Sequence, residues 1–356
     1  MSLQIRVKHQ FASFDLDVDI QTEGGVTALF GVSGSGKSTL VNAIAGLLKP
    51  DEGLIQVNGQ TLFDSNSGVN LAVHQRQVGY IFQDSRLFPH MSVKNNLRYS
   101  RWFGGRKSSR QQFKHLLELL NIGHLLERMP SGLSGGERQR VAIGRACLSD
   151  PAFLLADEPL AALDIERKQE ILPYFERLRD ELGLPIVYVS HSIDEVVRLA
   201  NSVAMLEQGR CVAQGLIDQV LADIRLANTQ TKPAGALWMA KVLTHHDDGV
   251  TEVTVGQQRL FLPSMQSLQQ DSIRLKINAE DVLLSASPVD DTSALNCITG
   301  VVTSILPMAG GRALVVLDTA AGQLNATITN RSVNRLQIEA GQTIYALLKS
   351  VAIVST

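Results

Sequence analysis

The feature of this chain that most constrains its fold is a glycine-rich stretch at residues 31–39. It reads Gly-Val-Ser-Gly-Ser-Gly-Lys-Ser-Thr and matches the phosphate-binding pattern G-x-x-x-x-G-K-[ST] at every fixed position. The apolar run 26–30 before it predicts a short buried strand, and residues 38–48 after it carry the apolar spacing of a helix. A strand, a phosphate-binding loop and a helix in this order predict an α/β fold.

The residue types in this loop suit a triphosphate. Glycines let the backbone curl so that successive N–H groups point at phosphate oxygens, and the N-terminus of the following helix adds partial positive charge. Lys37 can reach the β- and γ-phosphates, and the Ser38 hydroxyl can bind Mg²⁺. A Gly/Ser-rich turn that matches by chance is the alternative, which the flanking strand and helix disfavour. The predicted nucleotide-binding residues of the loop are Gly31, Ser33, Gly34, Ser35, Gly36, Lys37, Ser38 and Thr39.

Length and composition allow a globular protein of two or three domains. The 356 residues are 44% hydrophobic and 19% charged with a formal net charge of −2, so the chain as a whole lacks polyanion-binding character. No apolar run reaches the ~18 residues of a membrane-spanning helix, and the N-terminal residues lack a signal-peptide apolar region. Cys147, Cys211 and Cys297 lie far apart, which favours a reducing compartment and structural thiols.

Two kinds of patterning divide the chain. Up to about residue 225, short apolar strands alternate with amphipathic helices, and residues 111–120 are the clearest helix of a mostly helical block. We therefore expect a nucleotide-binding α/β domain over residues 1–228, with a helical subdomain at about 88–150. The strands predicted in this domain are residues 4–9, 26–30, 78–82, 153–156, 186–190 and 202–206.

The C-terminal region has a different character. A polar, breaker-rich linker is predicted at residues 229–240. Short strands separated by turns such as Asp247-Asp248-Gly249 follow, which predicts an all-β, OB-like barrel domain over residues 241–356, built as one small barrel or a pair. The predicted strands are residues 251–255, 298–305, 313–317, 323–328 and 344–353.

Two adjacent carboxylates complete the chemistry that a phosphate-binding loop needs. The apolar strand 153–156 delivers Asp157 and Glu158 at its end. Asp157 is placed to support Mg²⁺ through its water shell, and Glu158 can act as general base toward the attacking water. A strand that ends in an exposed acidic turn is the alternative, and it is disfavoured by the loop at 31–39.

Residues 133–140, which read Leu-Ser-Gly-Gly-Glu-Arg-Gln-Arg, identify a family resemblance. They are similar to the L-S-G-G-Q signature of the ATP-binding-cassette (ABC) family, with Glu137 where Gln is usual. Ser134, Gly135 and Gly136 open a helix whose free N–H groups and hydroxyl can grip a terminal phosphate. Ser134 and Glu137 also fit a capping box, so Glu137 serves the helix N-terminus in one interpretation.

Further residues take their roles from this resemblance. Gln83, after strand 78–82, resembles the glutamine that joins Mg²⁺ and the attacking water to the partner-facing region, so Ser38 and Gln83 are the implied metal ligands. His191, after strand 186–190, resembles the switch histidine that contacts the γ-phosphate, which gives Glu158, His191 and Gln83 as the catalytic set. Phe11 is the candidate for adenine stacking, with Phe14 next.

The resemblance also implies partners. It predicts a head-to-tail homodimer in which ATP lies between residues 31–39 of one copy and 134–137 of the other, with the loop 162–164 crossing to the second copy. Residues 87–93 resemble the region that docks a helix of an integral-membrane permease subunit. The chain has no sustained heptad run and no basic stripe, so we expect no nucleic-acid partner.

Segments of the C-terminal region resemble the molybdate-binding Mop barrel. They are residues 293–300, 327–332 and 345–350, within a Mop-like part at 292–354, and residues 274–282 resemble a strand–turn element of importer regulatory barrels. Leu295 and the serine near Lys349 depart from the usual pattern. The implied oxyanion ligands, which would act across a subunit interface, are Asn296, Thr329, Ser332, Lys349 and Ser350.

Taken whole, the chain resembles the ATP-binding subunits of bacterial molybdate importers. This implies ATP hydrolysis with Mg²⁺, a peripheral position at the cytoplasmic face of the inner membrane, molybdate at the barrel, and a periplasmic or lipoprotein oxyanion-binding protein as indirect partner. Importers of sulfate, iron, sugar or polyamine are alternatives that share the cassette. A DNA-repair or chromosome-organising ATPase and a non-catalytic oxyanion store or sensor are alternatives from other classes.

Overall fold

The computed structural model describes residues 2–11, 14–100, 109–222, 234–263, 272–289, 291–349 and 353–355. The chain divides into two compact units, Met1–Leu216 and Ile217–Thr356, and each is described by itself. None of the helices in these described ranges is long and apolar enough to span a membrane.

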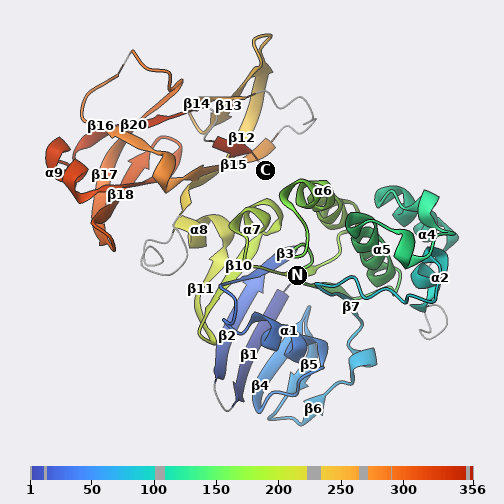
Figure 1. The fold of residues 1–356 in the computed structure, drawn as a ribbon. Coiled ribbons are helices and arrows are strands. Elements are labelled where there is room, and N and C mark those ends of the chain that lie inside the picture. Colours follow the sequence, from blue (N-terminus) through green and yellow to red (C-terminus); the bar gives the residue numbers. More distant parts are fainter. Residues whose placement is uncertain are drawn as a thin grey trace. The chain divides into compact units, whose positions relative to one another are not determined.

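The first unit alternates strands and helices around one large sheet (Figure 1). Its strands are β1 (Ser2–Gln10), β2 (Asp15–Glu23), β3 (Val26–Phe30), β4 (Glu52–Val57), β5 (Gln60–Asp64), β6 (Val69–Asn70), β7 (Val78–Ile81), β8 (Phe153–Asp157), β9 (Ile186–Ser190), β10 (Ser202–Glu207) and β11 (Arg210–Leu216). Its helices are α1 (Lys37–Ala45), α2 (Val93–Arg98), α4 (Arg110–Leu119), α5 (Gly135–Cys147), α6 (Ile165–Leu182) and α7 (Ile193–Leu199).

The sheet has a parallel half and an antiparallel half. The strand order is β6-β5-β4-β1-β2-β11-β10-β3-β9-β8-β7. Strands β10, β3, β9, β8 and β7 are parallel neighbours, whereas β1, β2, β4, β5 and β6 pair antiparallel. The parallel strands are buried on both faces, as their near-continuous apolar sequences require.

Helices cover the two faces of the parallel strands with separate cores. On β8, Phe153 and Leu155 pack in the core that contains α1, and the alternate residues Leu154 and Ala156 pack in the core that contains α5 and α6. This alternation follows from the two-residue period of a strand. The phosphate-binding loop and the helical block therefore belong to different layers of the same sheet.

The predicted elements of this unit are confirmed with small shifts of their ends. Strands 26–30 and 186–190 match β3 and β9, and residues 111–120 fall on α4 with a shift of one residue. The helix predicted at 38–48 is too long, because Gly46 takes a left-handed conformation (φ 83°) and ends α1 at Ala45. Leu47, beyond that end, is 57% exposed.

The C-terminus of α1 is held by a buried arginine. Arg76 is fully buried, and its Nη1 donates to the carbonyl oxygens of Ala43 at 2.7 Å and Ile44 at 2.9 Å. Its Nε and Nη2 donate to Leu71 O and Asn70 Oδ1, both at 2.9 Å. A positive group that satisfies the last carbonyls of α1 complements the helix dipole and fixes the helix that begins at Lys37.

In its described residues, the second unit is all-β apart from two short α-helices and the 3₁₀ turn Ala279–Asp281. Two five-stranded sheets, β14-β13-β12-β15-β21 and β16-β20-β17-β18-β19, share one apolar core. The strands are β12 (Ala234–His245), β13 (Val250–Val255), β14 (Gln258–Pro263), β15 (Ser272–Asn278), β16 (Leu283–Ser285), β17 (Asn296–Met308), β18 (Arg312–Thr319), β19 (Gly322–Thr329), β20 (Thr343–Leu348) and β21 (Ile353–Ser355). The helices are α8 (Ile217–Ala222) and α9 (Asn330–Leu336).

The all-β character predicted for this region is confirmed, with two corrections. Residues 234–240, predicted as linker, belong to β12, which pairs with β13 and β15. The prediction of one strand over residues 344–353 is wrong, because two strands are present. Strand β20 ends at Leu348 in one sheet, and β21 begins at Ile353 in the other.

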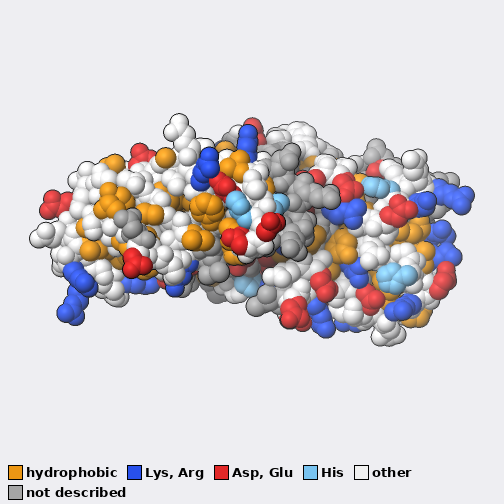
Figure 2. Space-filling model, turned by 90° about the horizontal axis from the view of Figure 1, so that it is seen from above, with side chains coloured by type: hydrophobic (Ala, Val, Ile, Leu, Met, Phe, Trp, Pro, Cys, Tyr) orange, Lys and Arg blue, Asp and Glu red, His pale blue; other side chains and the backbone are white. Residues whose placement is uncertain are grey.

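Charges of both signs are mixed over the surface. Figure 2 shows one face, on which Lys and Arg side chains lie among Asp and Glu side chains in each part that is coloured. Exposed ion pairs such as Arg6–Asp19 and Lys94–Glu127 illustrate this local neutralisation. The visible face thus carries no broad field of a single sign.

Candidate functional site

The parallel half of the sheet brings distant sequence motifs to one edge. The register pairs Phe30 with Ser190, Asp157 with Val189 and Ile81 with Ala156. The residues that directly follow these strands lie beyond the carboxyl ends of β3, β9, β8 and β7, where ligands of open α/β sheets bind. The phosphate-binding loop, Gln83, Glu158 and His191 all emerge there.

Lys37 occupies the centre of this edge. It is 4% exposed, and its Nζ donates to the carbonyl oxygens of Gly31 and Val32, both at 2.8 Å. The same Nζ lies 3.7 Å from Glu158 Oε1. Burial lowers the pKa of Lys37, and the negative charges of Glu158 and Asp157 oppose that change. The ammonium is therefore held inside the loop by weak acceptors that a phosphate can replace.

Two glycines of the loop, Gly31 and Gly36, are required by close approach. A Cβ on Gly36 (φ 100°) would lie 2.8 Å from Phe14 Cζ, and a Cβ on Gly31 would lie 2.2 Å from Leu206 O. Within the loop, Ser33, Gly34 and Ser38 are exposed, Thr39 is half-buried, and Ser35 and Gly36 are buried. The Ser35 hydroxyl oxygen is buried and has no hydrogen-bond partner among the described residues.

Asp157 presents one bonded and one unbonded oxygen. Its Oδ2 accepts a hydrogen bond from the Tyr80 hydroxyl at 3.2 Å, and its Oδ1 is buried with no hydrogen-bond partner in the described chain. Burial raises the pKa of Asp157, while the Tyr80 hydrogen bond and the positive charge of Lys37 work in the opposite direction.

Glu158 stands in a constrained conformation beside Lys37 and His191. Its φ is 44°, in the left-handed region that non-glycine residues rarely adopt, and its N–H donates to Val189 O at 3.1 Å. Oε1 faces Lys37, and Oε2 lies 3.2 Å from His191 Nδ1. Lys37 and His191, predicted from separate motifs, therefore both lie against the carboxylate of Glu158.

A buried network that sequence reasoning missed supports the turn carrying His191. Glu195 is 4% exposed, and its carboxylate accepts from Tyr188 Oη at 3.0 Å, Ser190 Oγ at 2.8 Å and Lys168 Nζ at 2.9 Å. Ser190 Oγ in turn accepts from the N–H of Ser192 at 3.0 Å. The only sequence signal was an acidic residue in the first turn of a helix, which is common.

The predicted metal-binding residues suit a hard cation. The unbonded Oδ1 of Asp157 is an acceptor-only atom at the edge where the exposed Ser38 hydroxyl lies, and the Ser38 side chain is one of the groups that lowers the Asp157 pKa. Among the described residues no cluster of three His, Cys, Asp or Glu forms a protein cage. Mg²⁺ keeps several waters and binds through one or two protein oxygens plus phosphates, so these residues fit it. Gln83 is exposed just beyond β7.

The signature residues form the N-terminus of α5. Ser134 Oγ accepts from Glu137 N at 3.2 Å, and Glu137 Oε2 accepts from Ser134 N at 2.7 Å, which is the capping box considered in the sequence. A Cβ on Gly135 would lie 3.5 Å from Leu163, so the signature adjoins the loop 162–164. In the described chain no hydrogen bond or ion pair joins residues 134–136 to residues 31–39.

The candidate adenine-stacking rings lie next to the loop. Phe14 packs on Gly36, whereas Phe11 is 39% exposed and makes an edge contact with the His9 ring at 4.4 Å. The two phenylalanine rings are 6.3 Å apart. Of the two, Phe11 offers the accessible face.

The residues predicted to bind an oxyanion do not converge within one chain. Asn296 pairs with Leu348 at one end of β17, and Lys349 follows directly. Thr329 pairs with Arg312, which pairs with Met308 at the other end of β17, and Ser332 lies beside it at 2.9 Å between hydroxyl oxygens. Ser350 lies outside the described residues.

Asn296 stays a predicted oxyanion ligand, and the structure shows a structural role for it as well. Asn296 is 1% exposed; its Oδ1 accepts from Phe261 N at 2.7 Å, and its Nδ2 donates to Phe261 O at 2.9 Å. The amide thereby joins β17 of one sheet to β14 of the other. Its oxygen and its nitrogen each bond a backbone group of Phe261, which gives the side chain a structural role.

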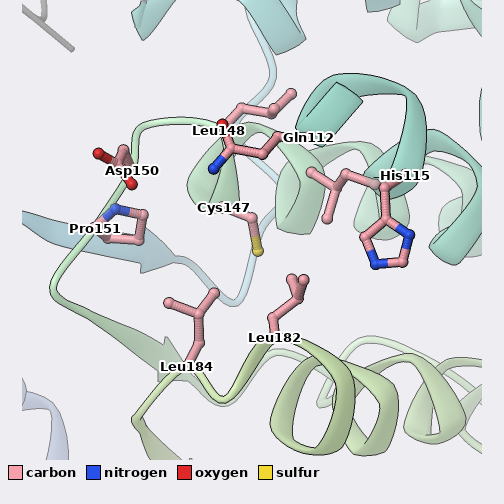
Figure 3. Close-up of a pocket in the computed structure, with 9 residues that line it drawn as sticks. Gln112, His115, Cys147, Leu148, Asp150, Pro151, Leu182 and Leu184 are labelled. Atoms are coloured by element: carbon pink, nitrogen blue, oxygen red, sulfur yellow. The ribbon is translucent and has the colours of Figure 1, made fainter. Parts of the chain in front are cut away.

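A separate cavity of about 220 Å³ lies among α4, the end of α5 and the end of α6 (Figure 3). In Figure 3 the Cys147 sulfur points into it, toward Leu182 and Leu184. Burial raises the pKa of Cys147 to about 12, so the thiol stays protonated and unreactive at neutral pH. This supports the structural role predicted for that cysteine.

Two family models match the chain. The ABC transporter model covers residues 14–161 and the TOBE domain model covers residues 292–354. The first match contains the phosphate-binding loop, the signature and the two carboxylates. The second contains every residue that was considered for the oxyanion.

Full-length relatives and solved structures agree with these models. The molybdenum import ATP-binding protein ModC of Rhizobium meliloti (strain 1021) is 46% identical over 356 residues, covering 99% of both chains, and that of Mesorhizobium japonicum is 44% identical over 354 residues, covering 99% of this chain and 96% of the relative. The dimeric ATP-binding cassette MJ0796 bound to ADP and Pi has a TM-score of 0.50 and 27% identity, covering 61% of this chain and 99% of that one. The cbiO1 protein of Clostridium perfringens gives a TM-score of 0.54 and 28% identity, with 64% and 94% coverage.

Proposed function

The chain belongs to the ATP-binding proteins of the ABC transporter family, and from that premise we propose that it hydrolyses ATP to drive molybdate import through a membrane permease. The substrate assignment is supported by relatives named for molybdenum import that are 43–46% identical over essentially the whole chain. The observation that carries the catalytic assignment is the convergence of Lys37 and His191 on Glu158 at the carboxyl edge of the sheet.

The residues at this edge divide the work of hydrolysis. In the chain by itself, Lys37 Nζ donates to two carbonyl oxygens of the loop. Phosphate oxygens that enter the loop replace these acceptors, so the ammonium then neutralises charge on the nucleotide. Glu158 takes a proton from the attacking water. The water oxygen forms a bond to the γ-phosphorus, and the bond between the γ-phosphorus and the β–γ bridging oxygen breaks, which releases ADP. His191, on the other side of Glu158, holds that carboxylate and faces the γ-phosphate. Mg²⁺, when bound near Asp157 and Ser38, supplies neutralisation of the phosphate charge.

Catalysis is proposed to need two copies. The hydroxyl oxygen of Ser134 accepts from Glu137 N, which leaves its O–H proton free to donate to a γ-phosphate of another copy. The 13-residue helix α5 begins there and adds its N-terminal partial charge. The similar cassette MJ0796 was solved as a dimer with ADP and Pi. A homodimer with two shared sites follows as the proposed assembly, in which Gln83 joins Mg²⁺ and the attacking water to the partner-facing region.

The proposed setting is the cytoplasmic face of the inner membrane. An import ATPase needs both a supply of ATP and a permease, so it is placed there as a peripheral subunit. The permease in turn receives the oxyanion from a periplasmic or lipoprotein binding protein. Residues 87–93, next to Gln83, are the proposed contact with the permease, because they link the nucleotide edge to the helical block that contains α2.

The barrel is proposed to bind the same oxyanion between copies. Thr329 is exposed and Ser332 half-buried at one end of the β17 sheet, and Lys349 is exposed at the other. A 13-residue strand spans up to about 40 Å at about 3.3 Å per residue. One anion can reach both groups only when the second copy supplies one of them.

Transport in a defined system tests this proposal. The full chain is reconstituted with its membrane subunits in liposomes, and phosphate release and uptake are measured with binding proteins loaded in turn with molybdate, sulfate, iron, sugar or polyamine. We expect ATP hydrolysis and labelled-oxyanion uptake to rise only with molybdate. Stimulation by another loaded binding protein alone would overturn the substrate, and absence of hydrolysis in every case would overturn the ATPase assignment.

A further inference from the structure

Tyr80, on β7, donates a hydrogen bond to the carboxylate pair. It lies one residue before the end of β7, where β7 runs parallel to β8 and Tyr80 pairs with Leu155. Its hydroxyl donates to Asp157 Oδ2 at 3.2 Å. Because β8 ends at Asp157, this hydrogen bond lies at the carboxyl end of the strand, at the edge of the sheet where the nucleotide is proposed to bind.

The bond gives the two oxygens of Asp157 different roles. Oδ2 is used by Tyr80, while Oδ1 is buried and lacks a hydrogen-bond partner in the described part of the chain. Buried polar atoms are nearly always paired, so an unpaired carboxylate oxygen beside a phosphate-binding loop is an acceptor kept for a ligand. Rotation of the carboxylate about its Cβ–Cγ bond would exchange the two oxygens and lose the Tyr80 hydrogen bond.

The Tyr80 ring itself is held rigidly. It stacks on Phe82 with ring centroids 4.0 Å apart and an interplanar angle of 18°, and the guanidinium of Arg86 lies 4.3 Å above the Phe82 ring. The stack therefore fixes the position of the Tyr80 hydroxyl, which donates its hydrogen bond to the Asp157 carboxylate.

We propose that Tyr80 is a positioning residue for Mg²⁺: its hydroxyl fixes the rotation of the Asp157 carboxylate so that Oδ1 faces the ion or its bound water. The inference rests on the proposed binding of Mg²⁺ with ATP. Partners that orient metal ligands contribute strongly to metal affinity, typically 10- to 100-fold. The phenol acts at one remove from the ion, so we expect a loss near the lower limit of that range.

The test removes the hydroxyl and keeps the ring. The full chain carrying Glu158→Gln, which slows hydrolysis, is compared with the same chain carrying Tyr80→Phe as well, with Mn²⁺ as the spectroscopic probe of the metal site. Electron paramagnetic resonance titration in the presence of ATP gives the Mn²⁺ dissociation constant. We expect Tyr80→Phe to raise it about tenfold, while ATP affinity measured in EDTA changes by less than about twofold because no nucleotide contact is removed.

Tyr188→Phe is the matched control. Tyr188 is also a buried tyrosine on a parallel strand, but its hydroxyl donates to Glu195 and touches no proposed metal ligand. We expect the Mn²⁺ dissociation constant of this variant to stay within about twofold of the parent. A similar rise in both variants would overturn the inference, since it would reflect general loosening, as would an unchanged constant in Tyr80→Phe.

A cycle with Asp157→Asn separates this inference from the proposed function. If Tyr80 acts only through Asp157, Tyr80→Phe should add no further loss of Mn²⁺ affinity in the Asp157→Asn background. An additive loss would overturn the inference while the metal site stands. If the parent chain binds no Mn²⁺ with ATP at all, both the proposed metal site and the inference that rests on it are overturned.

Discussion

In the first unit the predicted site residues meet at one edge of a sheet, whereas in the second unit they lie at the two ends of a strand. Parallel strands send all their carboxyl ends to the same edge, so Lys37, Glu158 and His191 converge although they are far apart in sequence. Antiparallel strands alternate their directions, so Thr329 and Lys349 diverge although they are close in sequence. Topology thus decides whether one chain can complete a site.

The largest expected effect tests the converged site. Glu158→Gln removes the proposed base and leaves the shape of the carboxylate, so phosphate release should fall by about 10²- to 10⁴-fold. ATP binding should persist, because Lys37 and the loop remain. Rapid-quench measurement of a single turnover at saturating Mg²⁺–ATP reports the chemical step directly.

Glu170→Gln on α6 provides the control for that measurement. Glu170 is exposed, and the same substitution there should leave the rate within about twofold. Wild-type rates in Glu158→Gln would show that another group takes the proton, and the convergence seen at this edge would then have no catalytic meaning.

The second prediction concerns the divided site. If an oxyanion lies between Thr329 and Ser332 of one copy and Lys349 of another, the variants Lys349→Ala and Thr329→Ala/Ser332→Ala should each lose molybdate binding. A mixture of the two that is allowed to exchange subunits should regain about a quarter of the wild-type sites, because half of the dimers are mixed and a two-fold interface leaves one intact site in each. Equilibrium dialysis with labelled molybdate counts the sites.

The mixture also shows how the comparison could fail. No recovery after subunit exchange would contradict a site shared between copies. Full binding in either variant alone would remove its residues from the ligand set. In each case the oxyanion site of the barrel would not be divided between two copies, and its contrast with the converged nucleotide site would fail.

The third prediction separates a structural residue from a ligand within the barrel. Asn296→Ala leaves both backbone groups of Phe261 without their partner, and a lost buried hydrogen-bond pair costs about 1–3 kcal/mol of unfolding free energy. Lys349→Ala removes an exposed side chain and should change stability by less than about 0.5 kcal/mol. Hydrogen exchange of β14 and β17 amides in the full chain measures the stability.

Molybdate binding by the folded fraction should show the reverse order, with loss in Lys349→Ala and retention in Asn296→Ala. Unchanged protection of β14 and β17 in Asn296→Ala would contradict the structural role. Loss of binding without loss of protection would instead keep Asn296 in the ligand set.

The difference between the units also explains what the sequence could predict. The loop at 31–39, the pair Asp157 and Glu158, and the capping box at Ser134 are local patterns, and their geometry is set within a few residues. Strands such as 26–30 and 186–190 were correct because continuous apolar runs mark strands that are buried on both faces.

Residues whose partners lie far away in sequence could not be found in this manner. Arg76 reads as a surface charge until the fold places it against the carbonyl of Ala43, 33 residues away. Glu195 and Tyr80 acquire their roles from partners on other strands or helices. The structural role of Asn296 was missed because its hydrogen-bond partner, Phe261, lies in a different sheet.

The smallest expected effect concerns Glu137, the departure from the usual signature. Its carboxylate accepts from Ser134 N, and this hydrogen bond, ahead of the charge of Arg128, lowers the Glu137 pKa below its usual 4.5. Glu137→Gln preserves the capping box but loses the charge at the positive end of α5, which contributes about 0.3–1 kcal/mol at such positions. Because the side chain is 19% exposed and screened, we expect the lower part of that range.

The sign of the pH dependence distinguishes a helix cap from a nucleotide contact. A carboxyl whose pKa is lower in the folded state stabilises the fold above its unfolded pKa, and this contribution is lost as pH falls through the folded pKa. The difference in thermal midpoint between wild type and Glu137→Gln should therefore be constant at neutral pH and be lost as pH falls through the lowered pKa of Glu137. A large change in ATP turnover with no such pH-dependent difference would show that Glu137 touches the nucleotide of the second copy. The signature would then depend on an acidic group as well as on its serine and glycines.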